Sequence, residues 1–197
     1  MIPPRLVLAT ANRGKAGELR DLVAEWGGDI EVLALDAFPS VACPPEQETS
    51  YEANALTKAR AVAAATGLPA LGDDSGLEVD ALGGAPGVRS ARYAASDPER
   101  VTKLLGALDA VTGEGRRARF RCVVALAWPD GRVETGEGEC RGQIATARSG
   151  GRGFGYDPVF VPDELGRTFA AASAEEKRAL SHRARAMRAL GGRLARS

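Results

Sequence analysis

The chain has 197 residues with 26 basic and 26 acidic side chains, so its formal net charge is zero. Proteins that bind nucleic-acid polymers usually carry a basic excess, and this balance argues against such a partner. No apolar run approaches the roughly 20 residues that span a membrane, and the N-terminus has no signal-peptide pattern. We therefore expect a cytoplasmic protein, and its length allows one domain or a two-lobed one.

Cysteine and histidine limit the chemistry further. Cys43, Cys122 and Cys140 form an odd set without metal-binding spacing, which favours a reduced, cytosolic chain. A single histidine, His182, nearly excludes a zinc cluster, so a metal site must use oxygen ligands and Mg²⁺, or Mn²⁺ in its place, is expected. A nucleophilic Cys43–His182 pair is a disfavoured alternative, because Cys43 precedes Pro44-Pro45 in a predicted loop.

The first half of the chain alternates strands and helices. Apolar runs predict strands, and apolar residues at helical spacing predict helices that Gly27-Gly28 and Gly67 end. Ser50 is the expected cap of the second helix. The expected elements are a strand at 6–9, a helix ending at 26, a strand at 30–35, a loop at 36–49 and a helix at 51–66.

The second half adds a long hairpin. We expect a strand at 69–72, a turn at 73–76, extended chain at 77–79 and a loop at 83–92. A helix follows, from an Asp97 cap to about 111. The hairpin strands are expected at 117–128 and 133–145, a further strand at 159–161, and helix from 174 with a break near Ser181. Early alternation followed by a hairpin favours an α/β fold with a mixed sheet. The arginines at 117, 119 and 121 are expected to meet Glu137 and Glu139 across the ladder.

The first candidate site follows the first strand. Thr10-Ala11-Asn12-Arg13-Gly14-Lys15 places a hydroxyl, an amide, two cations and a glycine where a strand opens into a helix. Backbone N–H groups and the positive end of the helix dipole meet at such a junction and attract phosphate. An ordinary capped helix start is the alternative. The segment is not a P-loop, since Ala16 follows the lysine.

The second candidate site is acidic. Asp73 and Asp74 are adjacent carboxylates that cannot both be buried without partners or a cation. Such a carboxylate can bind Mg²⁺ or activate water. Glu46 and Glu48 are further potential ligands, and Asn54 and Lys58 point the same way from their helix because they are four residues apart. A solvated turn at 73–76 and a solvated Lys58 are the alternatives.

Two later segments carry further candidates. Phe154, between glycines and followed by Tyr156 and Asp157, could stack on a base while the carboxylate accepts from ring N–H groups; a hydrophobic plug is the alternative. Lys177 and the pair His182-Arg183 lie on the last helical stretch. Taken alone, His182 is more often a surface or satisfied residue.

The order of these motifs resembles one family. The chain reads T-x-N-x-x-K, E-x-x-x-S-Y-x-x-N-A-x-x-K-A, D-D-S-G-L-x-V, L-G-G-A-P-G-V-x-S-A-R-Y, G-F-G-Y-D-P-V-F and E-E-K-x-x-x-S-H-R-x-x-A. It is similar, from about residue 6 to 190, to the inosine/xanthosine triphosphate pyrophosphatases. The resemblance implies a Mg²⁺-dependent homodimer with an elongated, two-lobed α/β fold around a mixed twisted sheet and a central cleft. The same resemblance implies that residues 1–197 form one domain whose two lobes are not independent domains. It also implies hydrolysis of noncanonical purine nucleoside triphosphates (dITP, ITP, XTP) to monophosphate and pyrophosphate.

The resemblance also implies residue roles. Asp74 would be the catalytic base and, with Glu46, the metal ligand. The substrate-binding set would comprise Thr10, Ala11, Asn12, Arg13, Gly14, Lys15, Lys58, Ser75, Phe154, Gly155, Tyr156, Asp157, Lys177, His182 and Arg183. In this set Phe154 would stack on the purine, and the residues from Tyr156 onward would close around its 6-oxo edge and sugar.

Two departures from the family pattern concern this assignment. The family commonly has glycine where this chain has Ala11, and a glutamate where it has Ala53. Glu52, one position earlier, cannot take that place, because one helical step turns a side chain by about 100°. The remaining alternatives are a related pyrophosphatase for another base, such as a modified pyrimidine, and a nucleotide-binding module without catalysis.

Overall fold

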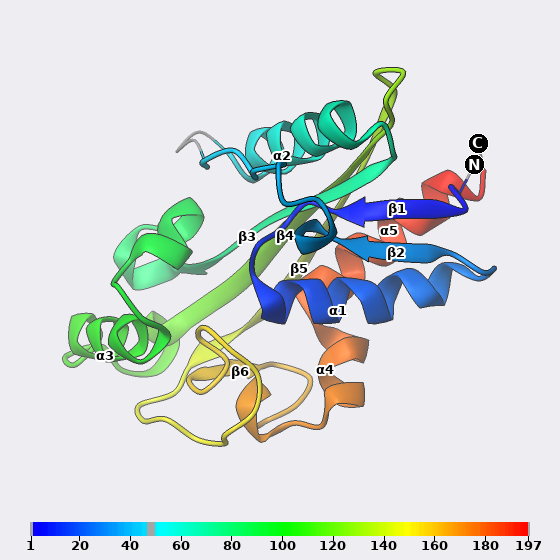
Figure 1. Ribbon diagram of the computed structural model, residues 1–197. Coiled ribbons are helices and arrows are strands. Elements are labelled where there is room, and N and C mark those ends of the chain that lie inside the picture. The colour runs from blue at the N-terminus through cyan, green and yellow to red at the C-terminus, as the bar shows by residue number, and fades with distance from the viewer. Residues whose placement is uncertain (1, 47–49, 197) are drawn as a thin grey trace. The chain divides into compact units, whose positions relative to one another are not determined.

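The computed structural model describes residues 2–46 and 50–196 (Figure 1). Glu48, a predicted additional ligand, lies outside the described residues. The helices are α1 Arg13–Val23, α2 Tyr51–Thr66, α3 Asp97–Ala107, α4 Ala174–Leu180 and α5 His182–Leu194. The strands are β1 Arg5–Leu8, β2 Glu31–Ala34, β3 Ala70–Val79, β4 Arg117–Ala127, β5 Val133–Ile144 and β6 Phe160–Pro162.

The strands form one sheet in the order β2-β1-β3-β4-β5-β6. β1 pairs in parallel with both β2 and β3, whereas β5 and β6 pair antiparallel. The predicted α/β class and mixed sheet are thus confirmed. Within the described residues no helix is long and apolar enough to span a bilayer.

The chain divides into two compact units. Unit 1 comprises the described parts of 1–74, 122–138 and 183–197, and unit 2 comprises 75–121 and 139–182. The chain passes from one unit to the other within β3, β4 and β5 and after the first residue of α5. Two of these passages, Asp74–Ser75 and His182–Arg183, fall between residues of the predicted site.

The core of unit 1 joins β1 to α1 and α5. Leu19, Leu22 and Val23 repeat at helical spacing and share a cluster with the buried leucines of β1. Figure 1 shows α1 running alongside β2, the strand that pairs with β1. α5 adds Met187 to the same cluster, and Trp26 Nε1 donates to the Met187 carbonyl at 3.1 Å. Each fully buried leucine contributes about 1.5–3 kcal/mol, so this apolar face fixes the start of α1 relative to β1.

The core of unit 2 is aromatic. The Phe120 and Phe160 rings meet edge-on at 4.6 Å between centroids, and Phe169 lies 5.6 Å from Phe160. Leu77 of β3 and Leu104 of α3 pack into the same cluster. This core anchors the C-terminal end of the 150–158 loop, because Tyr156 in the loop and Val159 directly after it belong to the cluster.

Most element predictions are confirmed, but the turn at 73–76 is wrong. β3 runs unbroken through Asp73-Asp74-Ser75-Gly76. A strand tolerates these carboxylates because cations from distant segments neutralise them, which local sequence cannot show.

The expected start and end of the third helix are also wrong. The cap of α3 is Ser96, whose Oγ accepts from Glu99 N at 3.4 Å, and α3 ends at Ala107 rather than near 111. A 3₁₀ helix occupies Gly87–Arg92 of the predicted 83–92 loop.

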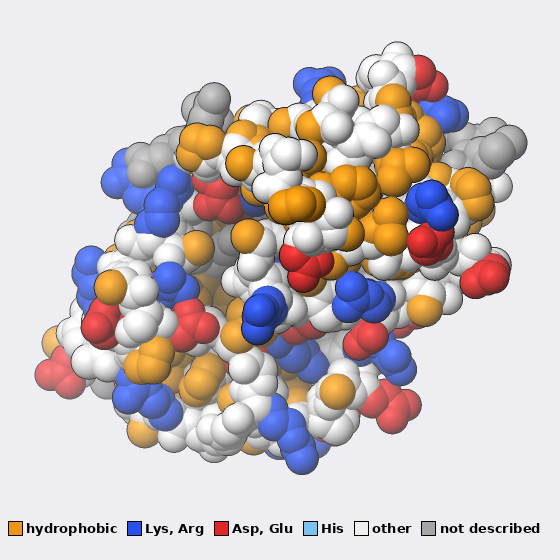
Figure 2. Space-filling view, viewed as in Figure 1, with side chains coloured by type: hydrophobic (Ala, Val, Ile, Leu, Met, Phe, Trp, Pro, Cys, Tyr) orange, Lys and Arg blue, Asp and Glu red, His pale blue; other side chains and the backbone are white. Residues whose placement is uncertain are grey.

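The predicted charge ladder is confirmed in part. Arg117 pairs with Asp163 at 2.7 Å, and Arg121 lies 3.7 Å from Glu78. Arg119 lies 3.7 Å from Glu139, as expected, and its shorter contact is with Glu78 of β3 at 2.8 Å. On the face seen in Figure 2, basic and acidic side chains of the described residues are interspersed rather than segregated. This distribution agrees with the balanced net charge.

Candidate active site

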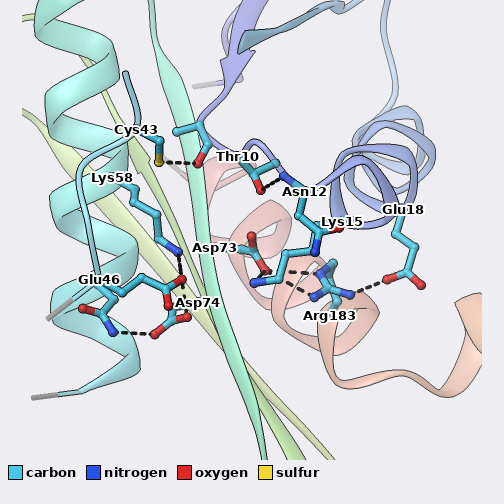
Figure 3. A network of polar contacts seen from close by, with 12 residues as sticks. Thr10, Asn12, Lys15, Glu18, Cys43, Glu46, Lys58, Asp73, Asp74 and Arg183 are labelled. Carbon is cyan, nitrogen blue, oxygen red and sulfur yellow. Dashed lines mark hydrogen bonds and ion pairs between the residues drawn. The ribbon is translucent and has the colours of Figure 1, made fainter. Parts of the chain in front are cut away.

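The two adjacent aspartates lie on β3 just past the end of β1. Leu8, the last residue of β1, pairs with Leu71, so Asp73 and Asp74 extend beyond that partner strand. Successive side chains of a strand point to opposite faces. Asp73 accordingly meets Lys15 and Arg183, whereas Asp74 meets α2 (Figure 3).

Asp74 is held by side chains of α2. Asn54 Nδ2 donates to Asp74 Oδ2 at 2.7 Å, and Lys58 Nζ lies 3.8 Å from Asp74 Oδ1. The same ammonium group donates to Glu46 Oε1 at 2.8 Å. The prediction that Asn54 and Lys58 share one face of this helix is confirmed, and Glu52 is exposed on another face.

A close approach of β3 to α2 makes these contacts reachable. A Cβ on Gly72 would lie 2.5 Å from the Ala55 carbonyl oxygen and 3.0 Å from Ala59 N. The first distance is shorter than any Cβ tolerates, and the second is tighter than most Cβ contacts. Glycine at position 72 therefore lets α2 pack on the strand close enough for Asn54 and Lys58 to reach Asp74.

The two aspartates differ in charge behaviour. Burial raises the pKa of Asp74 to about 6, Glu46 adds to the rise, and Lys58 and the Asn54 hydrogen bond reduce it. Burial also opposes ionisation of Asp73, but Lys15, Arg183 and Lys58 outweigh it and keep that pKa well below its ordinary value. Asp73 is thus a permanent anion, whereas Asp74 can exchange a proton near neutral pH.

The donor set around Asp74 fits a hard divalent cation. The carboxylates of Glu46 and Asp74 both face the Lys58 ammonium. Burial opposes the charge of Lys58, but Asp73, Asp74 and Glu46 outweigh it and keep the Lys58 pKa raised. No group of three or more His, Cys, Asp or Glu suited to a metal occurs among the described residues. Mg²⁺ commonly takes one or two carboxylates with water and substrate phosphate, and two carboxylates here meet that requirement.

The segment before α1 holds two polar side chains in backbone hydrogen bonds, and one of them caps the helix. Asn12 Oδ1 accepts from Lys15 N at 3.0 Å, and Thr10 Oγ1 accepts from Asn12 N at 3.2 Å. No acidic residue occupies the first turn of α1, so its dipole is available to an anion. Thr10, Ala11, Asn12 and Arg13 border a cavity of about 610 Å³ that reaches Phe38.

A second group of predicted residues is assembled within unit 2. Asp157 Oδ2 accepts from Phe154 N at 2.8 Å and from Lys177 Nζ at 2.5 Å. The same ammonium lies 4.7 Å from the centre of the Phe154 ring, and Gly155 N donates to Asp97 Oδ2 at 2.7 Å. These contacts fix the aromatic loop, leaving the Phe154 ring partly exposed.

Glycine is required at position 153 of this loop. Its φ is +75°, and a Cβ there would collide with the Asp157 carboxylate. The tight turn lets the Asp157 carboxylate accept hydrogen bonds from the Phe154 backbone N–H and from Lys177. The role of Asp157 as an acceptor from the purine ring stays a prediction.

The other predicted residues of unit 2 are largely buried. Tyr156 Oη donates to the Ser90 carbonyl at 3.0 Å, and burial raises the Tyr156 pKa. His182 stacks on Phe120 with ring centroids 4.6 Å apart and an interplanar angle of 12°. Ser75 follows Asp74 on β3 and is half-buried.

Arg183 is engaged inside unit 1. Its Nη2 lies 3.3 Å from Asp73 Oδ2, its Nη1 donates to Glu18, and its side chain is 2 % exposed. These contacts do not favour the predicted role at the 6-oxo edge of a purine, which stays a prediction.

The environment of Cys43 does not favour a nucleophilic thiolate. Cys43 Sγ donates to the Ala9 carbonyl at 3.5 Å, and burial raises the pKa of the thiol. A thiol kept protonated in this way is a poor nucleophile at neutral pH.

Four residues outside the predicted binding and catalytic set contact members of that set: Glu18, Asn54, Asp73 and Asp97. Helical spacing gave a signal for Asn54 and also for Glu18, which follows Lys15 by three residues. Asp97 gave none, because its partner is 58 positions away in the chain.

Comparison with known proteins identifies relatives over nearly the whole chain. The chain is 50% identical over 199 residues to a dITP/XTP pyrophosphatase of Nitratidesulfovibrio vulgaris, covering 96% of this chain and 95% of that protein. It is also 50% identical to a dITP/XTP pyrophosphatase of Thermus thermophilus, covering 94% of this chain and 89% of the relative.

Solved structures of similar sequence share the fold of this chain over nearly its whole length. The structure of a HAM1 protein from Coxiella burnetii superimposes with a TM-score of 0.86 at 40% identity, covering 99% of this chain and 100% of the other. The Ham1 protein of Staphylococcus aureus gives 0.83 at 36% identity, covering 97% and 98%. The model of the Ham1 family matches residues 6–192, and the chain belongs to that family.

Proposed function

We propose that this protein is a Mg²⁺-dependent pyrophosphatase that hydrolyses noncanonical purine nucleoside triphosphates (dITP, ITP, XTP) to the monophosphate and pyrophosphate. The main support is the Asp73-Asp74 pair of β3, which has Lys15 on one face and Lys58 with Glu46 on the other. The names of the relatives, dITP/XTP pyrophosphatases, support the same substrate class.

The triphosphate is bound at the start of α1. Lys15 supplies a charge, Thr10 and Asn12 supply polar groups, and the N–H groups of Arg13 and Gly14 precede the first intrahelical bond. The cavity beside Thr10–Arg13 makes this segment accessible. Lys58 assists from α2, where its ammonium is already close to both acids.

Asp74 is the base that accepts a proton from the attacking water. Its pKa of about 6 leaves it mostly ionised at pH 7, yet basic enough to accept a proton. Glu46 and Asp74 would hold Mg²⁺, which when bound supplies positive charge to the phosphate oxygens. Asn54 donates to Asp74 and so fixes which oxygen is directed to the water.

Base recognition falls to the loop of unit 2. Phe154 presents a ring for stacking, braced by Lys177 and Asp157, while Ser75, Tyr156 and His182 complete the binding set. Acceptors and donors matched to a 6-oxo purine would be left unpaired by adenine, which gives discrimination. We further propose that the protein acts as a cytoplasmic homodimer.

Steady-state kinetics with ITP, XTP, dGTP and dATP in Mg²⁺ test the proposal, with pyrophosphate detected directly. ITP and XTP are expected to exceed dATP in kcat/KM, and Asp74→Asn is expected to lower kcat by at least about a thousandfold. Asp109→Asn, on an exposed aspartate of unit 2, is the matched control.

Three outcomes would contradict the proposal. Orthophosphate as sole product would refute the bond that is cleaved. Higher kcat/KM with a modified pyrimidine would favour the related pyrophosphatase, and ITP binding without turnover in saturating Mg²⁺ would favour a binding module.

A further inference from the structure

A chain of alternating charges runs through unit 1 beside the proposed phosphate site. Glu18 of α1 accepts from Arg183 Nη1. Arg183 Nε and Nη2 lie 3.4 and 3.3 Å from Asp73 Oδ2, and Lys15 Nζ lies 3.0 Å from that same oxygen. The order Glu18–Arg183–Asp73–Lys15 is shown in Figure 3, and Glu18 has no part in the proposed chemistry.

The middle of this chain is fully buried. Asp73 is 0 % exposed and Arg183 is 2 % exposed, whereas Lys15 reaches 14 % at the phosphate end. Buried charges persist only when each is paired and hydrogen-bonded. The orientation of each group is therefore set by its neighbours in the chain rather than by solvent.

The two oxygens of the Asp73 carboxylate differ in their hydrogen bonds. Oδ2 meets Lys15 and both nitrogens of Arg183, whereas Oδ1 is buried without a hydrogen-bond partner among the described residues. Arg183 could improve its pairing by turning its fork to cover both oxygens, which is the preferred geometry of this pair. That turn would move one Arg183 nitrogen from Oδ2 to Oδ1 and change the orientation of the carboxylate oxygen that Lys15 meets.

Glu18 opposes that turn because it draws Nη1 away from Asp73. We propose that Glu18 is a positioning residue which, through Arg183 and Asp73, keeps Lys15 oriented for the triphosphate. This inference rests on the proposed function of Lys15. It predicts that loss of Glu18 weakens phosphate binding although Glu18 never touches the substrate, because a disordered Lys15 must be ordered again on binding.

The chain offers a matched control. Glu25, which follows α1, pairs with Arg188 of α5 at 3.1 Å and so links the same two segments as Glu18 and Arg183. The Glu25–Arg188 pair is 32 % and 46 % exposed and lies further along both segments, away from the start of α1. A purely structural tie between these segments would make Glu18→Gln and Glu25→Gln behave alike.

The test is a double-mutant cycle on the full chain, with Tm measured for every variant. Glu18→Gln is expected to raise KM for ITP about tenfold with kcat within about twofold, and Glu25→Gln to change neither. In a Lys15→Met background, Glu18→Gln is expected to cause no further loss. Equal losses in both backgrounds, or equal effects of Glu18→Gln and Glu25→Gln, would overturn the inference.

Binding of inorganic tripolyphosphate, measured by calorimetry, separates this inference from the proposed function. Glu18→Gln should weaken that binding about tenfold even if the wild-type chain does not hydrolyse ITP. Unchanged tripolyphosphate affinity would refute the positioning role whatever the activity. If Glu18→Gln does not fold, Glu18→Asp, which keeps the charge on a shorter stem, is expected to show an intermediate KM, and a wild-type KM in that variant would count against the inference.

Discussion

At the scale of single residues, the site is defined by how differently two neighbouring carboxylates are treated. Asp73 is surrounded by cations and Asp74 is not, because alternation along β3 turns them to opposite faces. The alternation of side chains along a strand predicted that only one of the two would face the site, and the family resemblance implied that Asp74 is the base. It could not predict the partners of Asp73, since Arg183 lies 110 positions away.

The raised pKa of Asp74 makes a prediction about stability without metal. A group whose pKa rises on folding, here from 3.8 to about 6, stabilises the native state below pH 3.8 and loses this contribution as pH rises to about 6. Above that pH the unfolding free energy is lower by at most about 3 kcal/mol than with a protonated carboxyl, because each unit of pKa shift corresponds to about 1.4 kcal/mol. Asp74→Asn should therefore be more stable than wild type at pH 7.5, and the difference should shrink towards pH 4.5.

Thermal unfolding in EDTA across this pH range checks the sign. Other carboxylates titrate in both proteins and cancel in the difference. A Tm difference that stays constant with pH, or an Asn variant that is less stable at pH 7.5, would show that burial does not disfavour the Asp74 charge.

At the scale of elements, the spacing between β3 and α2 decides whether the site forms. The sequence predicted α2 well, because Ser50 and Gly67 mark its ends and its spacing places Asn54 and Lys58 together. It did not predict that β3 continues through 73–76. Gly72 is the residue that connects the two elements, and its role became visible only from the close approach of α2.

Gly72→Ala should push α2 away from β3. The new Cβ meets backbone atoms of Ala55 and Ala59, which cannot turn aside as a side chain could, so we expect a loss of about 1–3 kcal/mol in unfolding free energy. Lys58 and Asn54 would withdraw from Asp74, and kcat should fall more than tenfold. Urea unfolding and steady-state kinetics measure the two effects.

Gly106→Ala is the control for this substitution. Gly106 lies in α3, its φ is not positive, and a Cβ there meets nothing within 4 Å. Alanine should stabilise this helix by up to about 1 kcal/mol and leave kcat unchanged. Wild-type activity in Gly72→Ala would show that the close packing of α2 is not needed for the site.

At the scale of the whole molecule, the order of strands already indicates where a ligand binds. The chain leaves β1 for β2 on one side and returns to β3 on the other, and in such sheets ligands bind beyond the carboxyl ends of the strands at this switch point. The α1 start and the aspartate pair both lie at that place in unit 1. Strand order depends on long-range pairing, so only the alternation of elements could be predicted from the sequence.

Metal addition tests this placement through stability. A cation that binds Glu46 and Asp74 relieves their repulsion and binds only the folded chain, so Mg²⁺ at a hundred times its Kd should add about 2.7 kcal/mol. For a chain of this size, that corresponds to a Tm rise of about 5–10 °C over the same protein in EDTA. The rise should vanish in Asp74→Asn and persist in Asp109→Asn, because only the first variant loses a carboxylate of the pair. An equal Tm rise in both variants would show that the metal binds elsewhere. Asp74 of β3 would then be a base that does not bind the cation.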